Sequence, residues 1–286
     1  MPELAYVNGE FMPIEEAVVP IEDRGMQFGD SLYEVVRLYD GKPFRLKEHL
    51  DRMRRGAEVI NLNLEAAGDL EAALNELIER AQIDTAFVYW QVTRGVAPRE
   101  HTIPDDLTPV VIATVQEMQE IDESKYQKGS RAFTQPDQRW ARRDVKATTL
   151  LPNIMARTYA INRGGYGAIL FEDDGKVTEG AVSNVFCVIN GVIRTHPTDH
   201  SVLPGISRAT ALECAEKLDL PYVEKSFTVQ EMMDASEVFF TDTYCEVMPV
   251  VEIDSQVIGD GSPGPVAAKL KKAFRQVVIE ETGADL

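Results

Sequence analysis

Helical and strand-like hydrophobic patterns follow one another along this chain, and their order constrains the fold more than any other feature. Over residues 46–60, apolar side chains recur at spacings of four, three, four and three, which predicts an amphipathic helix, and residues 68–83 repeat the pattern. Segments rich in β-branched and aromatic residues predict strands around these helices, at 4–7, 10–12, 31–39, 43–45, 85–93 and 108–115. Asn8-Gly9 is a typical hairpin turn between the first two. The first third is therefore predicted to be an antiparallel sheet with two helices packed on it, an α+β arrangement.

The second half alternates strands and helices more regularly. Helices are predicted at 150–163, 207–218 and 266–281, with Ser207 as an N-cap, and strands at 166–171, 182–189, 192–195, 238–241 and 247–253. Residues 119–130 are polar and nearly free of pattern. We therefore predict a small N-terminal α+β domain over 1–120, an interdomain connection at 121–130, and a larger C-terminal domain over 131–286.

Charge and cysteine content exclude several classes of protein. The 286 residues include 29 Lys and Arg against 47 Asp and Glu, a net charge of −18, which disfavours nucleic-acid and membrane-surface binding. No apolar stretch approaches the ~20 residues of a membrane span, and the N-terminus lacks the pattern of an export signal. The three cysteines form no CxxC pair and predict free buried thiols in a reducing cytoplasm. The four histidines are too scattered to predict a metal site.

Two charged residues stand out as candidates for catalysis. Lys146 is predicted to lie at the entry to an apolar helix, where burial disfavours the ammonium and leaves an amine able to attack a carbonyl. Most such lysines instead extend their amine to solvent. Glu179 follows Val177-Thr178 at a strand end, where a carboxylate inside a cleft could hold a protonated ring nitrogen. Without further context, the preferred interpretation is a turn residue beside Asp173-Asp174-Gly175.

Two further segments could bind anions. Leu203-Pro204-Gly205-Ile206-Ser207-Arg208 combines a turn with a helix start, whose N–H groups attract anions, although most helix starts cap only themselves. Arg99-Glu100-His101 presents two cationic side chains at i and i+2 of an extended loop, able to clamp a carboxylate. A solvated surface loop is the commoner outcome for such a triplet.

Taken together, the order of these residues resembles one family over essentially the whole chain: the class IV, or fold type IV, pyridoxal-phosphate transaminases. The most specific part is a spaced run: Glu179, Asn184, Phe186, Ile193-Arg194-Thr195 and Leu203-Pro204-Gly205-Ile206-Ser207-Arg208. Earlier matches stand in the family's order: Asp23-Arg24-Gly25, Phe28-Gly29-Asp30, Tyr33-Glu34, His49-Leu50-Asp51-Arg52 and Lys146. The resemblance implies two domains, the larger with a β-barrel-like core.

The resemblance also implies roles in binding pyridoxal 5′-phosphate. Lys146 matches the lysine that forms an internal aldimine with the cofactor and then shuttles a proton, and Glu179 matches the partner of the pyridine nitrogen. Arg52 matches the guanidinium on the phosphate. The remaining cofactor positions are Ser183, Asn184, Leu203, Gly205, Ile206, Ser207, Asp242 and Thr243. Asp242 departs from relatives that often place a small hydroxyl residue there, and a carboxylate beside a phosphate is repulsive unless turned away or paired.

The substrate assignment depends on Arg99 and His101. They resemble the Arg-x-His carboxylate trap of the D-amino-acid transaminases, where Tyr33 also contributes. In that subfamily the trap comes from the neighbouring subunit of a homodimer. The resemblance therefore implies transfer from a D-amino acid such as D-alanine to 2-oxoglutarate or pyruvate. A branched-chain L-amino-acid transaminase, an (R)-amine transaminase, an aminodeoxychorismate lyase and a non-enzymatic binding scaffold are the alternatives.

Overall fold

The computed structural model describes residues 4–286 and divides into two compact units. The first holds the chain up to Gln119 together with Val145–Thr149 and Val278–Leu286, and the second holds Glu120–Asp144 and Leu150–Val277. The predicted domains, 1–120 and 131–286 with a connection at 121–130, remain our proposal. The prediction that the N-terminus lacks an export signal rests partly on residues 1–3, which lie outside the described residues.

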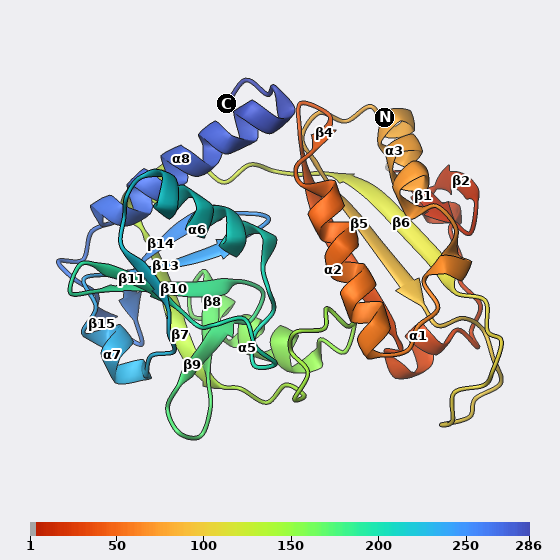
Figure 1. Ribbon diagram of the computed structural model, residues 1–286, viewed down its shortest axis with the longest axis horizontal. Helices are drawn as coiled ribbons and strands as arrows, with labels where there is room; N and C mark the ends of the chain where they lie inside the picture. The colour runs from red at the N-terminus through yellow and green to blue at the C-terminus, as the bar shows by residue number, and fades with distance from the viewer. Residues whose placement is uncertain (1–3) are drawn as a thin grey trace. The chain divides into compact units, whose positions relative to one another are not determined.

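An antiparallel sheet forms the first unit, with strands in the order β2-β1-β6-β5-β3-β4 (Figure 1). Its strands are β1 (Leu4–Val7), β2 (Glu10–Pro13), β3 (Ser31–Tyr39), β4 (Lys42–Pro43), β5 (Ala86–Thr93) and β6 (Val110–Glu117). Its helices are η1 (Ile14–Glu16), α1 (Arg24–Phe28), α2 (Leu46–Val59), η2 (Glu65–Ala67) and α3 (Leu70–Ala81). The β1–β2 turn has positive φ at Asn8 (46°) and Gly9 (100°), as the Asn-Gly pair predicts.

The apolar stripes of α2 and α3 form one core with the sheet. Leu50 and Met53 of α2 and Leu77 of α3 are buried against the face of the sheet that carries Val36 and Trp90. The indole nitrogen of Trp90 donates to the sulfur of Met53 at 3.3 Å. The predicted α+β arrangement of the first third is thus confirmed, and it fixes which face of β3 is covered by helix.

A mixed, curled half-barrel sheet forms the second unit, in the order β12-β11-β10-β13-β14-β7-β8-β9, with β15 beside β14. Its strands are β7 (Ser130–Pro136), β8 (Gly167–Phe171), β9 (Val177–Gly180), β10 (Asn184–Ile189), β11 (Val192–Thr195), β12 (Tyr222–Glu224), β13 (Glu237–Asp242), β14 (Glu246–Ile253) and β15 (Gln256–Val257). Its helices are α4 (Glu123–Lys128), α5 (Leu151–Ile161), α6 (Ile206–Lys217), α7 (Val229–Met233) and α8 (Pro265–Thr282), whose last residues belong to the first unit. The β-barrel-like core implied by the resemblance is confirmed.

Several sequence predictions need correction. Ser207 is not the N-cap of α6, because the helix begins at Ile206 and Gly205 takes the cap position without any side-chain cap. Lys146 does not enter a helix, because α5 begins at Leu151 and Lys146 lies in an extended segment beside β3. The polar stretch before residue 130 contains α4, and β7 follows it. The three cysteines are buried, as predicted, and they form no disulfide within residues 4–286.

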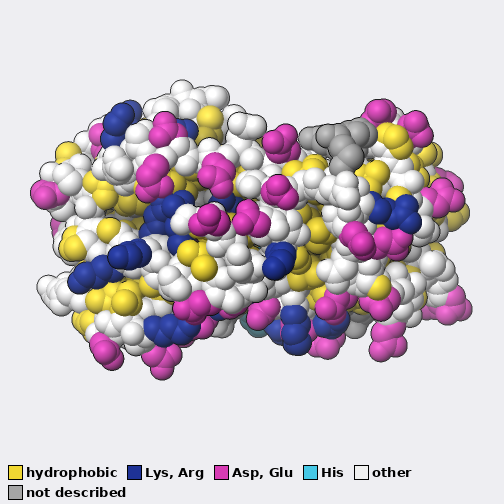
Figure 2. Space-filling model, turned by 90° about the horizontal axis from the view of Figure 1, so that it is seen from above, with side chains coloured by type: hydrophobic (Ala, Val, Ile, Leu, Met, Phe, Trp, Pro, Cys, Tyr) yellow, Lys and Arg dark blue, Asp and Glu magenta, His cyan; other side chains and the backbone are white. Residues whose placement is uncertain are grey.

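The surface agrees with the acidic composition. Figure 2 shows carboxylate side chains spread over the visible face, with lysines and arginines interspersed among them. Among residues 4–286, no helix combines the length and the apolar character needed to cross a membrane.

Candidate active site

Lys146 is held against the edge of β3 by backbone hydrogen bonds. The N–H of Tyr33 donates to the carbonyl of Lys146 at 3.0 Å, and the N–H of Thr148 donates to the carbonyl of Ser31 at 3.2 Å. The Lys146 amine lies 3.4 Å from the Tyr33 hydroxyl and 4.4 Å from the centre of its ring. The structure therefore brings together the predicted lysine and Tyr33, which are 113 residues apart in the chain.

The next residue of β3, Glu34, points to the opposite, helix-covered face and is fully buried. Arg52 of α2 donates to both of its carboxylate oxygens, at 2.7 and 2.6 Å, and Nδ1 of His49 lies 2.8 Å from Oε2. Despite burial, these partners lower the pKa of Glu34 to about 2, while burial lowers the pKa of His49. Arg52 is thus engaged by a carboxylate that the sequence analysis left without a role, and its contact with a phosphate remains a proposal.

The Glu34 cluster predicts a specific acid sensitivity. Because folding lowers the pKa of Glu34 from 4.5 to about 2, its stabilising contribution is complete above pH 4.5 and disappears as the pH falls towards 2. We expect wild type to lose about 2 kcal/mol more unfolding free energy than Glu34→Gln between pH 6 and pH 3. Denaturant unfolding at both pH values measures this difference, with Glu48→Gln, at an exposed position of α2, as the control. Equal losses of unfolding free energy in wild type and Glu34→Gln would show that folding does not lower the pKa of Glu34.

Arg99 and His101 lie exposed on a loop of the first unit whose base is fixed by buried groups. The Arg24 guanidinium, only 4% exposed, donates to the carbonyls of Glu100 and Thr102 at 2.8 and 3.2 Å. The centre of the Phe28 ring lies 4.6 Å from Cζ of Arg99, 4.8 Å from Cζ of Arg24 and 5.7 Å from the centre of the His101 ring. The two predicted trap residues are therefore displayed together from a rigid base.

Glu179 lies at the end of β9 in the second unit and is 3% exposed. Its carboxylate accepts hydrogen bonds from Nη1 of Arg139, from Nδ2 of Asn184 at 2.9 Å and from the N–H of Leu203 at 3.0 Å. Burial raises the pKa of Glu179, and the charge of Arg139 opposes that shift. Three N–H donors on one carboxyl group require acceptor oxygens, so we assign Glu179 as the anion at neutral pH. The turn-residue alternative is excluded by this burial.

Arg139 is itself fixed by a second buried carboxylate. Asp137 accepts from Nη2 and Nε of Arg139, at 2.7 and 3.0 Å, and from the hydroxyl of Thr178 at 2.8 Å. The sequence analysis missed Asp137 and Arg139. The only signal was their i, i+2 spacing directly after β7, which does not distinguish a buried ion pair from ordinary surface charges.

The start of α6 is adjacent to this carboxylate network. Asn184 also donates to the carbonyl of Leu203 at 3.0 Å, and a Cβ on Gly205 would lie 2.0 Å from the Asn184 side-chain oxygen, so this backbone position requires glycine. Asn184 pairs in register with Thr241 at the end of β13, and Asp242 and Thr243 follow. The second unit therefore gathers Glu179, Asn184, Leu203 and Gly205 near the chain that leads to Thr243.

Asp242 is turned into its own loop. One carboxylate oxygen accepts from the N–H groups of Tyr244 and Cys245, at 2.8 and 2.7 Å, and the other accepts from the Tyr166 hydroxyl at 3.2 Å. The carboxylate is thus paired, which removes the objection that a negative charge there would repel a phosphate.

This half-site fits a ligand that carries both a phosphate and a protonated nitrogen. The first turn of α6 has no side-chain cap, so its N–H groups are available to an anion, and Ser207 is buried among them. The buried hydroxyl of Thr241 has no hydrogen-bond partner among residues 4–286. The buried Glu179 anion supplies the complementary site for a cationic nitrogen.

Comparison with known proteins assigns the family. The family model for amino-transferase class IV matches residues 31–253, most of the chain. The protein therefore belongs to the class IV aminotransferases, which are pyridoxal-phosphate enzymes. The family prediction made from the residue pattern is confirmed, and the non-enzymatic scaffold is excluded.

Individual relatives refine the comparison. The chain is 42% identical over 276 residues to the D-alanine aminotransferase of Bacillus licheniformis, covering 96% of this chain and 97% of the relative. It is 40% identical over 281 residues to that of Listeria monocytogenes, covering 97% and 96%. Among solved structures it resembles the branched-chain amino acid aminotransferase of Escherichia coli, at TM-score 0.89 and 25% identity, covering 99% and 96%. It also resembles the branched-chain enzyme of T.th. with pyridoxamine 5′-phosphate, at TM-score 0.88 and 29% identity, covering 99% and 95%.

Proposed function

We propose that this protein transfers the amino group of a D-amino acid, D-alanine in the first place, to a 2-oxo acid such as 2-oxoglutarate or pyruvate. The observation that carries the proposal is the similarity to two D-alanine aminotransferases, at 42% and 40% identity over nearly the full length of each. The fixed Arg99–His101 loop supports it, since this pair is suited to a substrate carboxylate. Amino and 2-oxo acids are the substrates of the class.

The proposed cofactor is pyridoxal 5′-phosphate, which when bound supplies an aldehyde and an electron-accepting pyridine ring. The Lys146 amine, beside the Tyr33 hydroxyl, would hold the cofactor through its aldehyde and would move a proton at the substrate's Cα. Glu179, which accepts a hydrogen bond from Arg139, would hold the proton on the ring nitrogen. The N–H groups of Ile206 and Ser207 and the side chain of Thr243 would hold the phosphate, and Leu203 would contact the ring.

Four further residues complete the proposed cofactor site. Arg52 adds a guanidinium to the phosphate partners. Asn184 orients Glu179 through its 2.9 Å hydrogen bond, while Ser183 and Asp242 shape the neighbouring turns. For Asp242 we propose backbone contact only, because its carboxylate is already paired with Tyr166 and two N–H groups of its own turn.

We also propose a cytoplasmic homodimer in which Arg99 and His101 serve the partner's active site. Exposed apolar side chains in both units support a self-association surface: Val18 (78% exposed), Ile21 (76%) and Met26 in the first, and Leu151 (68%) and Met155 in the second. The three buried cysteines, which form no disulfide within residues 4–286, support a reducing compartment.

A panel of D- and L-amino acids, followed by bleaching of the cofactor absorbance, tests this function. We expect rapid turnover of D-alanine with 2-oxoglutarate and little turnover of L-leucine. Activity on L-leucine alone would instead identify a branched-chain transaminase, the candidate favoured by the solved relatives. Turnover of (R)-amines alone would identify an (R)-amine transaminase, and pyruvate release from aminodeoxychorismate without an amino acceptor would identify the lyase.

Mixing two inactive variants tests whether Arg99 acts in the active site of the partner subunit. If Arg99 acts on the partner's active site, a mixture of Lys146→Ala and Arg99→Met subunits contains heterodimers in which one site has both wild-type residues. We expect random reassociation to restore about a quarter of wild-type activity, because half of the dimers each hold one intact site. Unmixed variants serve as controls. Activity no greater than the average of the two variants would show that Arg99 acts within its own subunit.

A further inference from the structure

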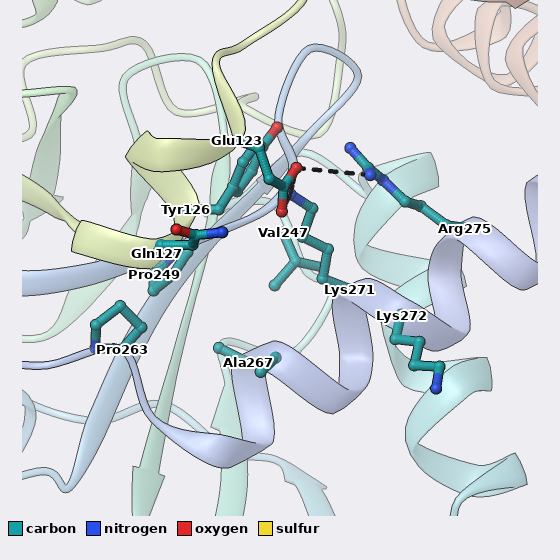
Figure 3. A pocket seen from close by; sticks show the side chains of 11 residues that line it. Glu123, Tyr126, Gln127, Val247, Pro249, Pro263, Ala267, Lys271, Lys272 and Arg275 are labelled. Carbon is teal, nitrogen blue, oxygen red and sulfur yellow. Dashed lines mark hydrogen bonds and ion pairs between the residues drawn. The ribbon is translucent and has the colours of Figure 1, made fainter. Parts of the chain in front are cut away.

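A cavity of about 350 Å³ lies in the second unit, between α4, β14 and α8 (Figure 3). None of its lining residues belongs to the candidate active site. Its walls are mainly apolar, formed by Tyr126 of α4, Val247 and Pro249 of β14, Pro263 just before α8, and Ala267 in the first turn of α8. A cavity of this size and character suits a short aliphatic chain.

One buried amine lines this cavity. The side chain of Lys271 is only 10% exposed, and its nitrogen lies 2.7 Å from the centre of the Tyr126 ring. Glu123 holds the amine through a long ion pair, with its oxygens at 3.2 and 3.3 Å, and is itself more than half exposed. Figure 3 shows the Glu123 carboxylate between Lys271 and Arg275.

The charged groups around Lys271 come from all three elements. Glu123 belongs to α4, Arg275 to α8, and the buried Glu246 to β14, where it accepts from Arg275 Nε at 3.1 Å. Burial and the charge of Arg275 lower the pKa of Lys271 to about 8, against the opposing effect of the two carboxylates. Part of the amine is therefore uncharged and nucleophilic near neutral pH.

We propose that Lys271 is a covalent modification site that reacts with short-chain acyl phosphates. The apolar walls receive the acyl chain. Lys272, which is exposed and also lines the cavity, attracts the phosphate dianion, since Arg275 is already paired with Glu246 and Glu123. This modification would be additional to the transamination chemistry and would use residues that the candidate active site leaves out.

The step balances without any oxidant or reductant. The Lys271 nitrogen attacks the carbonyl carbon, a C–N bond forms, and the C–O bond to phosphate breaks with its electron pair leaving on inorganic phosphate. The surplus proton on nitrogen passes to the Glu123 carboxylate and from there to the departing phosphate, which leaves as hydrogen phosphate. The resulting amide is neutral, so the ion pair between Lys271 and Glu123 is lost, while the pair between Arg275 and Glu123 remains.

Peptide mapping of the holoenzyme after treatment with acetyl or butyryl phosphate tests the proposal. We expect Lys271 to be acylated about tenfold faster at pH 7.5 than Lys269, an exposed lysine of α8 outside the cavity, because more of its amine is unprotonated. The preference is expected to be greater with butyryl phosphate, whose chain is longer. Equal or slower acylation of Lys271 with both donors would overturn the proposal.

A cavity-blocking variant separates access from general reactivity. Ala268→Phe places a ring at an exposed position of the lining and is expected to remove the preference for Lys271, whereas Gln276→Phe, exposed on the same helix outside the lining, is expected to keep it.

Wild type gives a second readout that needs no variant. The Lys271 rate, divided by that of Lys269, should fall as pH rises from 8 to 10, because the Lys271 amine is already deprotonated. A constant ratio, or an unchanged preference in folded Ala268→Phe, would also overturn the proposal.

Discussion

Replacing Lys146 with alanine is expected to lower kcat by at least about 10⁴-fold, because the substitution removes the amine that we propose reacts with the aldehyde and moves the Cα proton. The side chain is partly exposed and its amine makes a long hydrogen bond to Tyr33, so little stability should be lost. Steady-state turnover of D-alanine, together with denaturant unfolding, separates these effects.

Lys176 provides the matched control for Lys146. It is exposed and its amine pairs with the neighbouring Asp174, so Lys176→Ala should keep full activity. A Lys146→Ala enzyme that retained a tenth of wild-type turnover would show that another base carries the reaction.

The second large effect is expected at Glu179. The Glu179→Gln side chain has nearly the same shape but no charge, so the ring nitrogen would lose the anion that we propose keeps it protonated. We expect kcat to fall by about 10²-fold, equivalent to about 2.7 kcal/mol of barrier. The same substitution leaves Arg139 with one carboxylate instead of two, so unfolding free energy should fall as well.

Asp137→Asn distinguishes charge at the ring nitrogen from damage to the ion-pair network. It removes the other carboxylate partner of Arg139 and leaves the Glu179 carboxylate intact. We expect a comparable loss of stability but a loss of kcat of no more than about tenfold. If both variants lose activity equally, Glu179 acts through the network and not through its charge at the nitrogen.

Local patterns predicted much of this fold because the relevant forces act over a few residues. The spacing of apolar side chains predicted α2 and α3, and the Asn8-Gly9 pair predicted the first hairpin. Helix α4 was missed because its six residues contain one apolar side chain, Tyr126, whose burial depends on distant parts of the chain. Its hydroxyl donates to the carbonyl of Cys245, 119 residues away.

The residues of the candidate site also fall into those that local sequence predicted and those that it did not. Lys146, Glu179 and the start of α6 could be singled out because each has a local chemical signature and stands in a recognisable order. The partners that position them are distant in sequence: Arg139 is 40 residues from Glu179, and Arg52 pairs with Glu34 of a strand that precedes its helix. No local pattern specifies such pairs, since a charged residue on a strand or helix face is usually solvated.

The central claim is that the Lys146 amine is the group that takes the cofactor aldehyde. Borohydride reduction of the holoenzyme fixes that nitrogen to the cofactor, and peptide mapping locates it. We predict one phosphopyridoxyl group per subunit, on the peptide that contains Lys146. A label on any other lysine, or no label, would contradict the account.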